Sequence, residues 1–154
     1  MSELTQLDKT FSFIMKRMVK TGQAPFYTEI AKELGVSVEE GRKALHNVIK
    51  LAPFFSVFPN TDYVAVFPPF SNLPTQYRIT IDGKQKWFGQ CGFESLAVTW
   101  LFPRETVQID APCLDCREPI QVKMKDGVVQ SAPKELVGYT SVPLREWSTD
   151  FPFA

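Results

Sequence analysis

The sequence predicts an α+β protein built from a winged-helix-like helical domain and a small, mostly antiparallel sheet domain with an inserted helix. Three observations support this. Apolar residues recur at helical spacing before residue 52, a proline-rich run occupies 68–74, and apolar residues alternate with polar ones beyond it. At 154 residues and 44% hydrophobic content the chain can bury a substantial core. We therefore predict domains at 1–67 and 75–154, joined by a linker at 68–74.

The first helix is predicted from an apolar stripe with lysines on the opposite face, followed by Gly22 as a stop signal. The stripe consists of Leu4, Leu7, Phe11, Ile14, Met15 and Met18.

A helix-turn-helix follows, with helices expected from Tyr27 and over 38–51. Gly35 supplies the turn between them, and Ser37 with Glu40 forms a capping box at the start of the second helix.

Residues 54–58 and 63–67 are predicted to form the two strands of a wing. Over residues 1–60 there are eight basic and six acidic side chains, an excess of 8 − 6 = +2, which is modest for a protein that enters a DNA groove. Glu39 and Glu40 at the start of the recognition-like helix would face phosphates. A structural role or pairing with a second copy of the chain is therefore favoured, and DNA is the alternative partner.

Beyond the linker, residues 77–81 and 84–88 alternate around the Asp82-Gly83 turn, which predicts a hairpin. A helix is expected over 92–101, before Pro103. Three further strands are predicted at 107–109, 120–124 and 128–129, the last two joined by Asp126-Gly127.

Composition excludes several classes of function. Seventeen basic and 17 acidic side chains give a formal charge of zero, so the chain has no general attraction to nucleic acid or anionic membrane. No apolar run approaches the roughly 20 residues needed to cross a bilayer. The first residues lack the features of a secretory signal, and we expect a cytoplasmic protein with free thiols and no membrane partner.

Cys91 is the first candidate site residue. It precedes the expected helix, whose unpaired N–H groups favour a thiolate, and Glu94 lies one turn along the same face. A thiolate beside a carboxyl group that can pass a proton is a workable acid–nucleophile pair. The alternative is that Cys91 is a small buried apolar residue and Glu94 a solvated acid in the first turn.

Cys113 and Cys116 form a Cys-x-x-Cys pair that follows a predicted strand. A structural zinc site normally needs four ligands, and this pair supplies two. A redox dithiol usually begins a helix, whereas this pair is followed by a strand. Structural thiols in a turn and a metal-binding role therefore both stay open.

The chain resembles the alkylmercury lyase (organomercurial lyase) family. The resemblance rests on Cys91-Gly92-Phe93-Glu94 opening a helix after an aromatic-rich strand, and on a later strand that leads to Cys113. It spans roughly residues 76–130 by motif and the remainder by the order of elements.

This resemblance implies cleavage of carbon–mercury bonds by protonolysis. Cys91 would take up the mercury, Glu94 would match the acid that delivers a proton to the departing carbon, and Cys113 would match a structural cysteine. No cofactor is implied, because mercury is the substrate and product; a small organometal or a thiol is the expected partner.

The sequence departs from the family pattern in two ways. The acid is glutamate where the family usually has aspartate, and residues 137–154 contain no cysteine where a second catalytic one is expected. Cys113, Cys116 or an external thiol would have to replace that sulfur. The alternative functions are a metal- or thiol-responsive winged-helix regulator that uses Cys91, Cys113 and Cys116 as a three-sulfur sensor, and an inactive relic whose pocket binds another small molecule.

Overall fold

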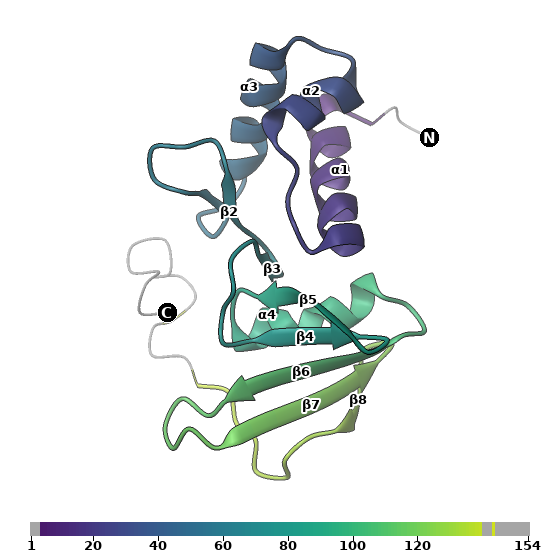
Figure 1. Cartoon of the computed structure of the whole chain (residues 1–154), viewed down its shortest axis with the longest axis vertical. Helices are drawn as coiled ribbons and strands as arrows, with labels where there is room; N and C mark the ends of the chain where they lie inside the picture. Colours follow the sequence, from purple (N-terminus) through teal and green to yellow (C-terminus); the bar gives the residue numbers. More distant parts are fainter. Residues whose placement is uncertain (1–3, 140–142, 144–154) are drawn as a thin grey trace. The chain divides into compact units, whose positions relative to one another are not determined.

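The computed structural model describes residues 4–139 and residue 143. The chain divides into two compact units, residues 1–67 and 68–154, each with its own helices and strands (Figure 1). The predicted α+β class is confirmed, because helices and an antiparallel sheet are both present.

The first unit begins with three helices, α1 (Gln6–Thr21), α2 (Tyr27–Leu34) and α3 (Val38–Ile49). Their ends follow the local signals in the sequence. Gly22 and Gly35 adopt left-handed backbone conformations, with φ of 78° and 66°, as a residue that closes a helix commonly does. Ser37 and Glu40 make the predicted capping box, with 2.6 Å between the Ser37 hydroxyl and a Glu40 carboxylate oxygen.

A two-stranded hairpin completes this unit. Strands β1 (Ser56–Val57) and β2 (Val64–Phe67) pair antiparallel within the segments predicted for the wing. The rings of Phe11, Phe55 and Phe67 meet at centroid distances of 5.0–6.2 Å and join helix α1 to the hairpin. The fully buried core residues of the unit include Ile14, Met18, Ile30, Leu45, Val48, Val64 and Phe67.

The second unit is an antiparallel sheet in the order β3-β5-β4-β6-β7-β8 (Figure 1). Its strands are β3 (Phe70–Ser71), β4 (Arg78–Ile81), β5 (Lys84–Gly89), β6 (Thr106–Pro112), β7 (Pro119–Lys125) and β8 (Val128–Ser131). Strand β3 lies within the segment predicted as a linker, and it pairs with β5. It joins the sheet because Phe70, only 1% exposed, is part of the core.

Two tight turns set the register of the sheet. Asp82 and Gly83 have φ of 48° and 70°, and Asp126 and Gly127 have φ of 49° and 80°. Positive φ at both central residues is the geometry of a type I′ turn, one of the two common two-residue hairpin turns. Both turns predicted from the sequence are therefore confirmed.

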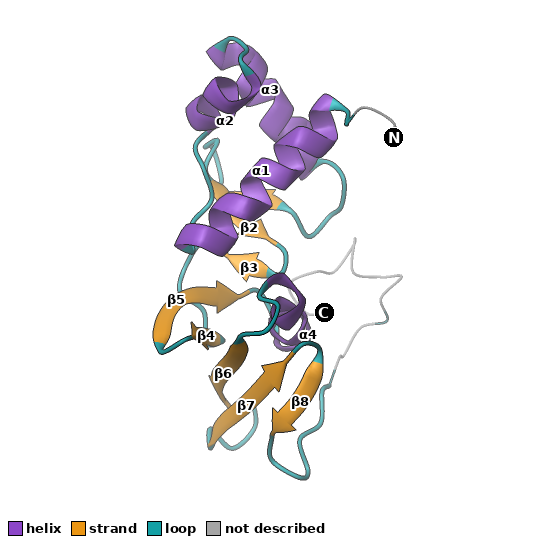
Figure 2. Ribbon diagram, turned by 90° about the vertical axis from the view of Figure 1, so that its right-hand side faces the viewer, coloured by secondary structure: helices purple, strands orange, loops and turns teal. Residues whose placement is uncertain are grey.

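One helical segment connects β5 to β6 on one face of the sheet (Figure 2). It begins as α4 (Gly92–Ala97) and tightens into the 3₁₀ helix η1 (Val98–Leu101), where one continuous helix was predicted. Helix α4 contacts β5, and η1 contacts β6. The buried apolar side chains of the sheet come from alternate strand positions that the register pairs across neighbouring strands, namely Ile79, Ile81, Val107, Ile109, Val122 and Met124.

None of the helices in the described part of the chain is long and apolar enough to span a membrane.

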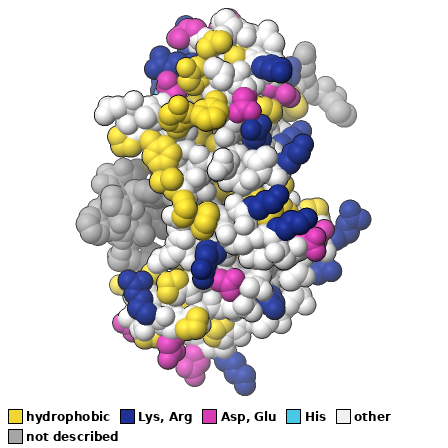
Figure 3. Space-filling view, viewed as in Figure 1, with side chains coloured by type: hydrophobic (Ala, Val, Ile, Leu, Met, Phe, Trp, Pro, Cys, Tyr) yellow, Lys and Arg dark blue, Asp and Glu magenta, His cyan; other side chains and the backbone are white. Residues whose placement is uncertain are grey.

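The surface carries charges of both signs. On the face shown in Figure 3, basic and acidic side chains are interspersed, in keeping with 17 residues of each kind in the sequence. Mixed charge of this kind gives no broad electrostatic attraction to a polyanion.

Candidate active site at the start of helix α4

Cys91 is the N-cap residue of α4, in an extended backbone conformation with φ of −142° and ψ of 175°. Its Sγ accepts a hydrogen bond from the backbone N–H of Glu94 at 3.4 Å. A cap position places the sulfur beside backbone donors that the first turn of a helix leaves unpaired. Cys91 and Glu94 are both half-buried, and the Glu94 backbone lies against the Cys91 sulfur.

The turn that carries Cys91 is fixed by neighbouring hydroxyl groups. The Ser95 hydroxyl donates to the Cys91 carbonyl oxygen at 2.6 Å, and the Thr75 hydroxyl donates to the Gly89 carbonyl oxygen at 2.7 Å. A Cβ atom on Gly89 would lie 1.9 Å from the Ser95 hydroxyl oxygen. Gly89 is thus required for space, because the end of β5 meets the first turn of α4 there.

We expect Gly89→Ala to lower the free energy of unfolding by about 1–3 kcal/mol, the usual cost of forcing an extra carbon into a packed site. Gly92→Ala is the matched control, because its new Cβ would meet only the Tyr77 ring, at an ordinary 3.5 Å. Chemical denaturation of both variants measures the effect. Equal stability of the two variants would contradict the close packing of β5 on α4.

Glu94 has the most perturbed electrostatic environment of the site. Burial raises the pKa of its carboxyl group from 4.5 to about 7. One carboxylate oxygen, Oε2, is buried and has no hydrogen-bond partner among the described residues. At neutral pH a substantial fraction of this carboxyl group therefore carries a proton.

The sequence led us to expect a stabilised thiolate at Cys91. In the structure the surroundings of Cys91 favour the protonated thiol instead. Burial raises the pKa of the Cys91 thiol; the N–H of Glu94 acts to lower it, and the nearby Glu94 charge raises it again. Desolvation outweighs the hydrogen bonds from the short helix. Cys91 therefore rests as a thiol, and it ionises most readily when its proton is replaced by a thiophilic metal.

Gln90 is a site residue that the sequence analysis did not identify. Its backbone N–H donates to the Pro69 carbonyl oxygen at 3.1 Å, while its side-chain Oε1 is buried and lacks a hydrogen-bond partner within residues 4–139. Gln90 and Glu94 therefore place two unsatisfied buried oxygens on either side of Cys91 in the sequence. Buried polar atoms without a partner are uncommon in folded proteins, and a catalytic role or a bound water or ion is among the explanations for them.

Cys113 and Cys116 lie in the loop between β6 and β7, here called the Cys113–Cys116 loop. The N–H of Cys113 donates to the Glu118 carbonyl oxygen at 2.8 Å, and Arg117 adopts a left-handed conformation with φ of 66°. Hydrogen bonds to the Cys113 sulfur from the N–H groups of Cys116 and Asp115, and from the Cys116 thiol, lower the pKa of the Cys113 thiol. Cys113 is half-buried and Cys116 is exposed, and both are free thiols.

The sheet register relates Cys91 to this loop. Phe88 of β5 and Asp110 of β6 both pair with Arg78 of β4, so β5 and β6 run in the same direction on either side of β4. Cys91 and Cys113 each follow three residues later, at the same end of the sheet. Two strand spacings of about 4.8 Å separate the strands that lead to them.

The described residues contain no group of three His, Cys, Asp or Glu side chains placed to hold one metal ion. Cys91 is consequently not assembled with Cys113 and Cys116 into a three-sulfur site, although all three thiols belong to the second unit.

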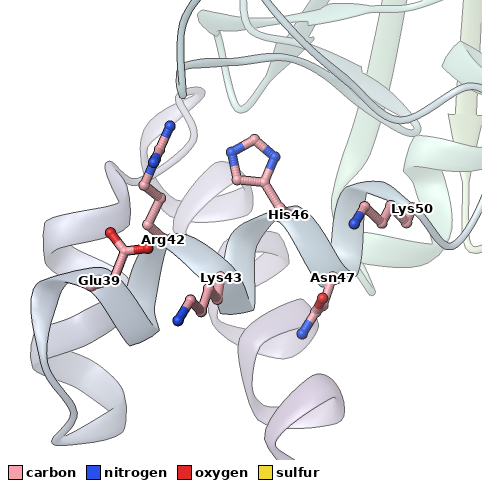
Figure 4. A pocket seen from close by; sticks show the side chains of 6 residues that line it. All are labelled: Glu39, Arg42, Lys43, His46, Asn47 and Lys50. Atoms are coloured by element: carbon pink, nitrogen blue, oxygen red, sulfur yellow. The ribbon is translucent and has the colours of Figure 1, made fainter.

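A hollow of about 250 Å³ lies along the exposed face of α3 in the first unit (Figure 4). Its lining residues are Glu39, Arg42, Lys43, His46, Asn47 and Lys50. Arg42 and His46 both bind the carboxylate of Asp62, at 2.9 and 2.6 Å. Glu39 and Asp62 partly offset the positive charge of Arg42, Lys43 and Lys50 on this face.

The fold and the site define a small α+β protein with a cysteine and a protonatable carboxyl group at the start of a short helix. The chain belongs to the alkylmercury lyase family, whose sequence profile, described as MerB: Alkylmercury lyase, matches residues 70–151, just over half of the 154 residues.

A solved structure gives the same fold. The chain is similar to the crystal structure of the mercury-bound form of MerB2, with a TM-score of 0.62 and 16% sequence identity. The similarity covers 82% of this chain, and the chain spans 61% of the length of that structure. No curated protein is detectably similar in sequence.

Proposed function

We propose that the protein cleaves the carbon–mercury bond of small organomercurials, with Cys91 as the mercury ligand and Glu94 as the proton donor. The observation that carries the proposal is the Glu94 carboxyl group, whose pKa of about 7 lets it hold a proton at neutral pH, near enough for its charge to act on the Cys91 thiol. Membership of the alkylmercury lyase family supports the choice of substrate.

The proposed reaction has two steps. First, the Cys91 thiol loses its proton as its sulfur binds the mercury of an organomercury cation, and the carboxylate form of Glu94, whose charge acts on the Cys91 thiol, takes that proton up. Second, another thiolate binds the mercury, the carbon–mercury bond breaks, and its electron pair takes the proton from Glu94. The hydrocarbon leaves, and the mercuric ion stays between two sulfurs.

The second thiolate is proposed to come from a small external thiol. Residues 137–154 contain no cysteine, and the strands that lead to Cys91 and Cys113 lie two strand spacings apart, or about 9.6 Å. Two sulfurs that share a metal must lie within about 5 Å of each other, twice a metal–sulfur bond of about 2.3 Å. A free thiol can reach the half-buried Cys91 without that constraint.

We therefore expect the intact protein to release benzene from phenylmercuric acetate when a small monothiol is in excess. Gas chromatography of the headspace measures the product. Without added thiol, release should stay well below one equivalent per chain, because the step that breaks the carbon–mercury bond lacks its second sulfur. Benzene formation no faster than in thiol-containing buffer alone would overturn the proposed function.

A further inference from the structure

The proposed reaction leaves one cluster of reactive side chains unused, the two thiols of the Cys113–Cys116 loop. Both are free, and Cys116 is exposed at the surface of the second unit. Two thiols separated by two residues on one tight loop differ from an isolated cysteine, because a single ion can bind both at once.

The loop backbone holds Cys113 in a defined position. The Cys113 N–H bonds to the Glu118 carbonyl oxygen, and the Arg117 N–H returns to the Cys113 carbonyl oxygen at 3.2 Å. The left-handed backbone of Arg117 closes the turn. These bonds direct the N–H groups of Asp115 and Cys116 onto the Cys113 sulfur, so donors that stabilise a thiolate are already in place.

The number of ligands selects the kind of ion. Among the residues that the structure describes, no third His, Cys, Asp or Glu joins the pair to make a metal-binding group. Structural zinc sites almost always take four ligands, so two sulfurs suit an ion that is satisfied by two. Thiolates also select soft metals over hard ones.

We infer that Cys113 and Cys116 form a chelating site for one soft, two-coordinate metal ion, for which mercuric ion is the test probe. On binding, each sulfur forms one bond to the metal and each thiol releases its proton to solvent, so no oxidant or reductant takes part. The site is separate from Cys91, and the inference does not depend on carbon–mercury cleavage.

The test is a titration of the reduced, intact Cys91→Ser protein with mercuric chloride under anaerobic conditions, in the presence of about 0.1 mM competing monothiol. Ultraviolet absorbance of the mercury–sulfur bonds reports binding. We expect one ion per chain. A second thiolate on the same short loop has an effective concentration of about millimolar or more. Removing the Cys116 thiolate, with the double variant Cys91→Ser/Cys116→Ser, should therefore weaken mercuric ion binding at least about tenfold.

Asp115→Asn in the Cys91→Ser background is the matched control, because it changes the loop and keeps both sulfurs. It should still bind one ion per chain with two-sulfur absorbance. Circular dichroism checks that each variant is folded; Cys116 is exposed, so the serine fits its position. Unchanged affinity in the Cys91→Ser/Cys116→Ser protein, or two-sulfur absorbance only at two chains per ion, would overturn the inference, whatever the outcome of the benzene assay.

Discussion

Replacing Cys91 with serine should abolish organomercurial cleavage, with a loss of at least about 10³-fold, as is typical when an essential nucleophile is removed. The serine hydroxyl can keep the cap position beside the Glu94 N–H, which now bonds to the sulfur at 3.4 Å. It is a hard oxygen ligand that does not hold mercury as a thiolate does. The rate of benzene release measures the change.

Cys116→Ser is the matched control for that experiment. It removes a thiol from the same unit, at an exposed position outside the candidate active site. The initial rate of benzene release should match that of the unaltered chain. Loss of activity in Cys116→Ser, with Cys91→Ser still active, would contradict the proposed role of Cys91 and assign mercury binding to the Cys113–Cys116 loop.

Glu94→Gln should slow the chemical step by about 10²–10⁴-fold, the usual contribution of a positioned general acid. Glutamine has nearly the same shape as glutamate. Its amide is far too weak an acid to donate the proton. The effect should depend on pH. The raised pKa of about 7 means that the carboxyl group loses its proton, and with it donor capacity, as pH rises through that value.

Single-turnover rates of the two proteins, measured with Cys91 already loaded with phenylmercury, isolate this dependence. Ionisation of the external thiol affects both proteins equally, so it cancels in the ratio of the rate of the unaltered chain to that of Glu94→Gln. The ratio should fall as pH rises from about 6 to about 8. A ratio that is constant over this range would remove Glu94 as the proton donor.

Signals that act within a few residues allowed much of the fold to be predicted. The capping box of Ser37 and Glu40, the stop at Gly22 and the Asp-Gly turns all depend on local backbone geometry. Cys91 and Glu94 were predicted together for the same reason, because one helical turn brings them onto one face.

Features set by tertiary packing could not be read in this way. Phe70 lies among prolines, yet it enters a strand because the core of the second unit buries it. The helix N-terminus suggested a thiolate at Cys91, but the burial that raises the pKa of both Cys91 and Glu94 exists only after folding. The unsatisfied oxygen of Gln90 likewise has no signature beyond its place beside Cys91.

The relation between the two sulfur-bearing loops also needed the structure. Alternating apolar residues predicted strands β4, β5 and β6 individually. Their spatial order, with β4 between the other two, follows from long-range pairing. That order brings Cys91 and Cys113 to the same end of the sheet, although they are separated by a helix and a strand in the sequence.

The buried Glu94 oxygen that lacks a partner has a consequence for protein engineering. A carboxyl group whose pKa is higher in the folded than in the unfolded chain makes folding less favourable as pH rises from about 4.5 to about 7. Substitutions that remove this charge are therefore the kind that a screen for thermal tolerance selects. A stabilised version of this chain should be designed with Gln90, Cys91 and Glu94 held fixed, since optimising this helix for robustness would select against the acid that the proposed chemistry needs.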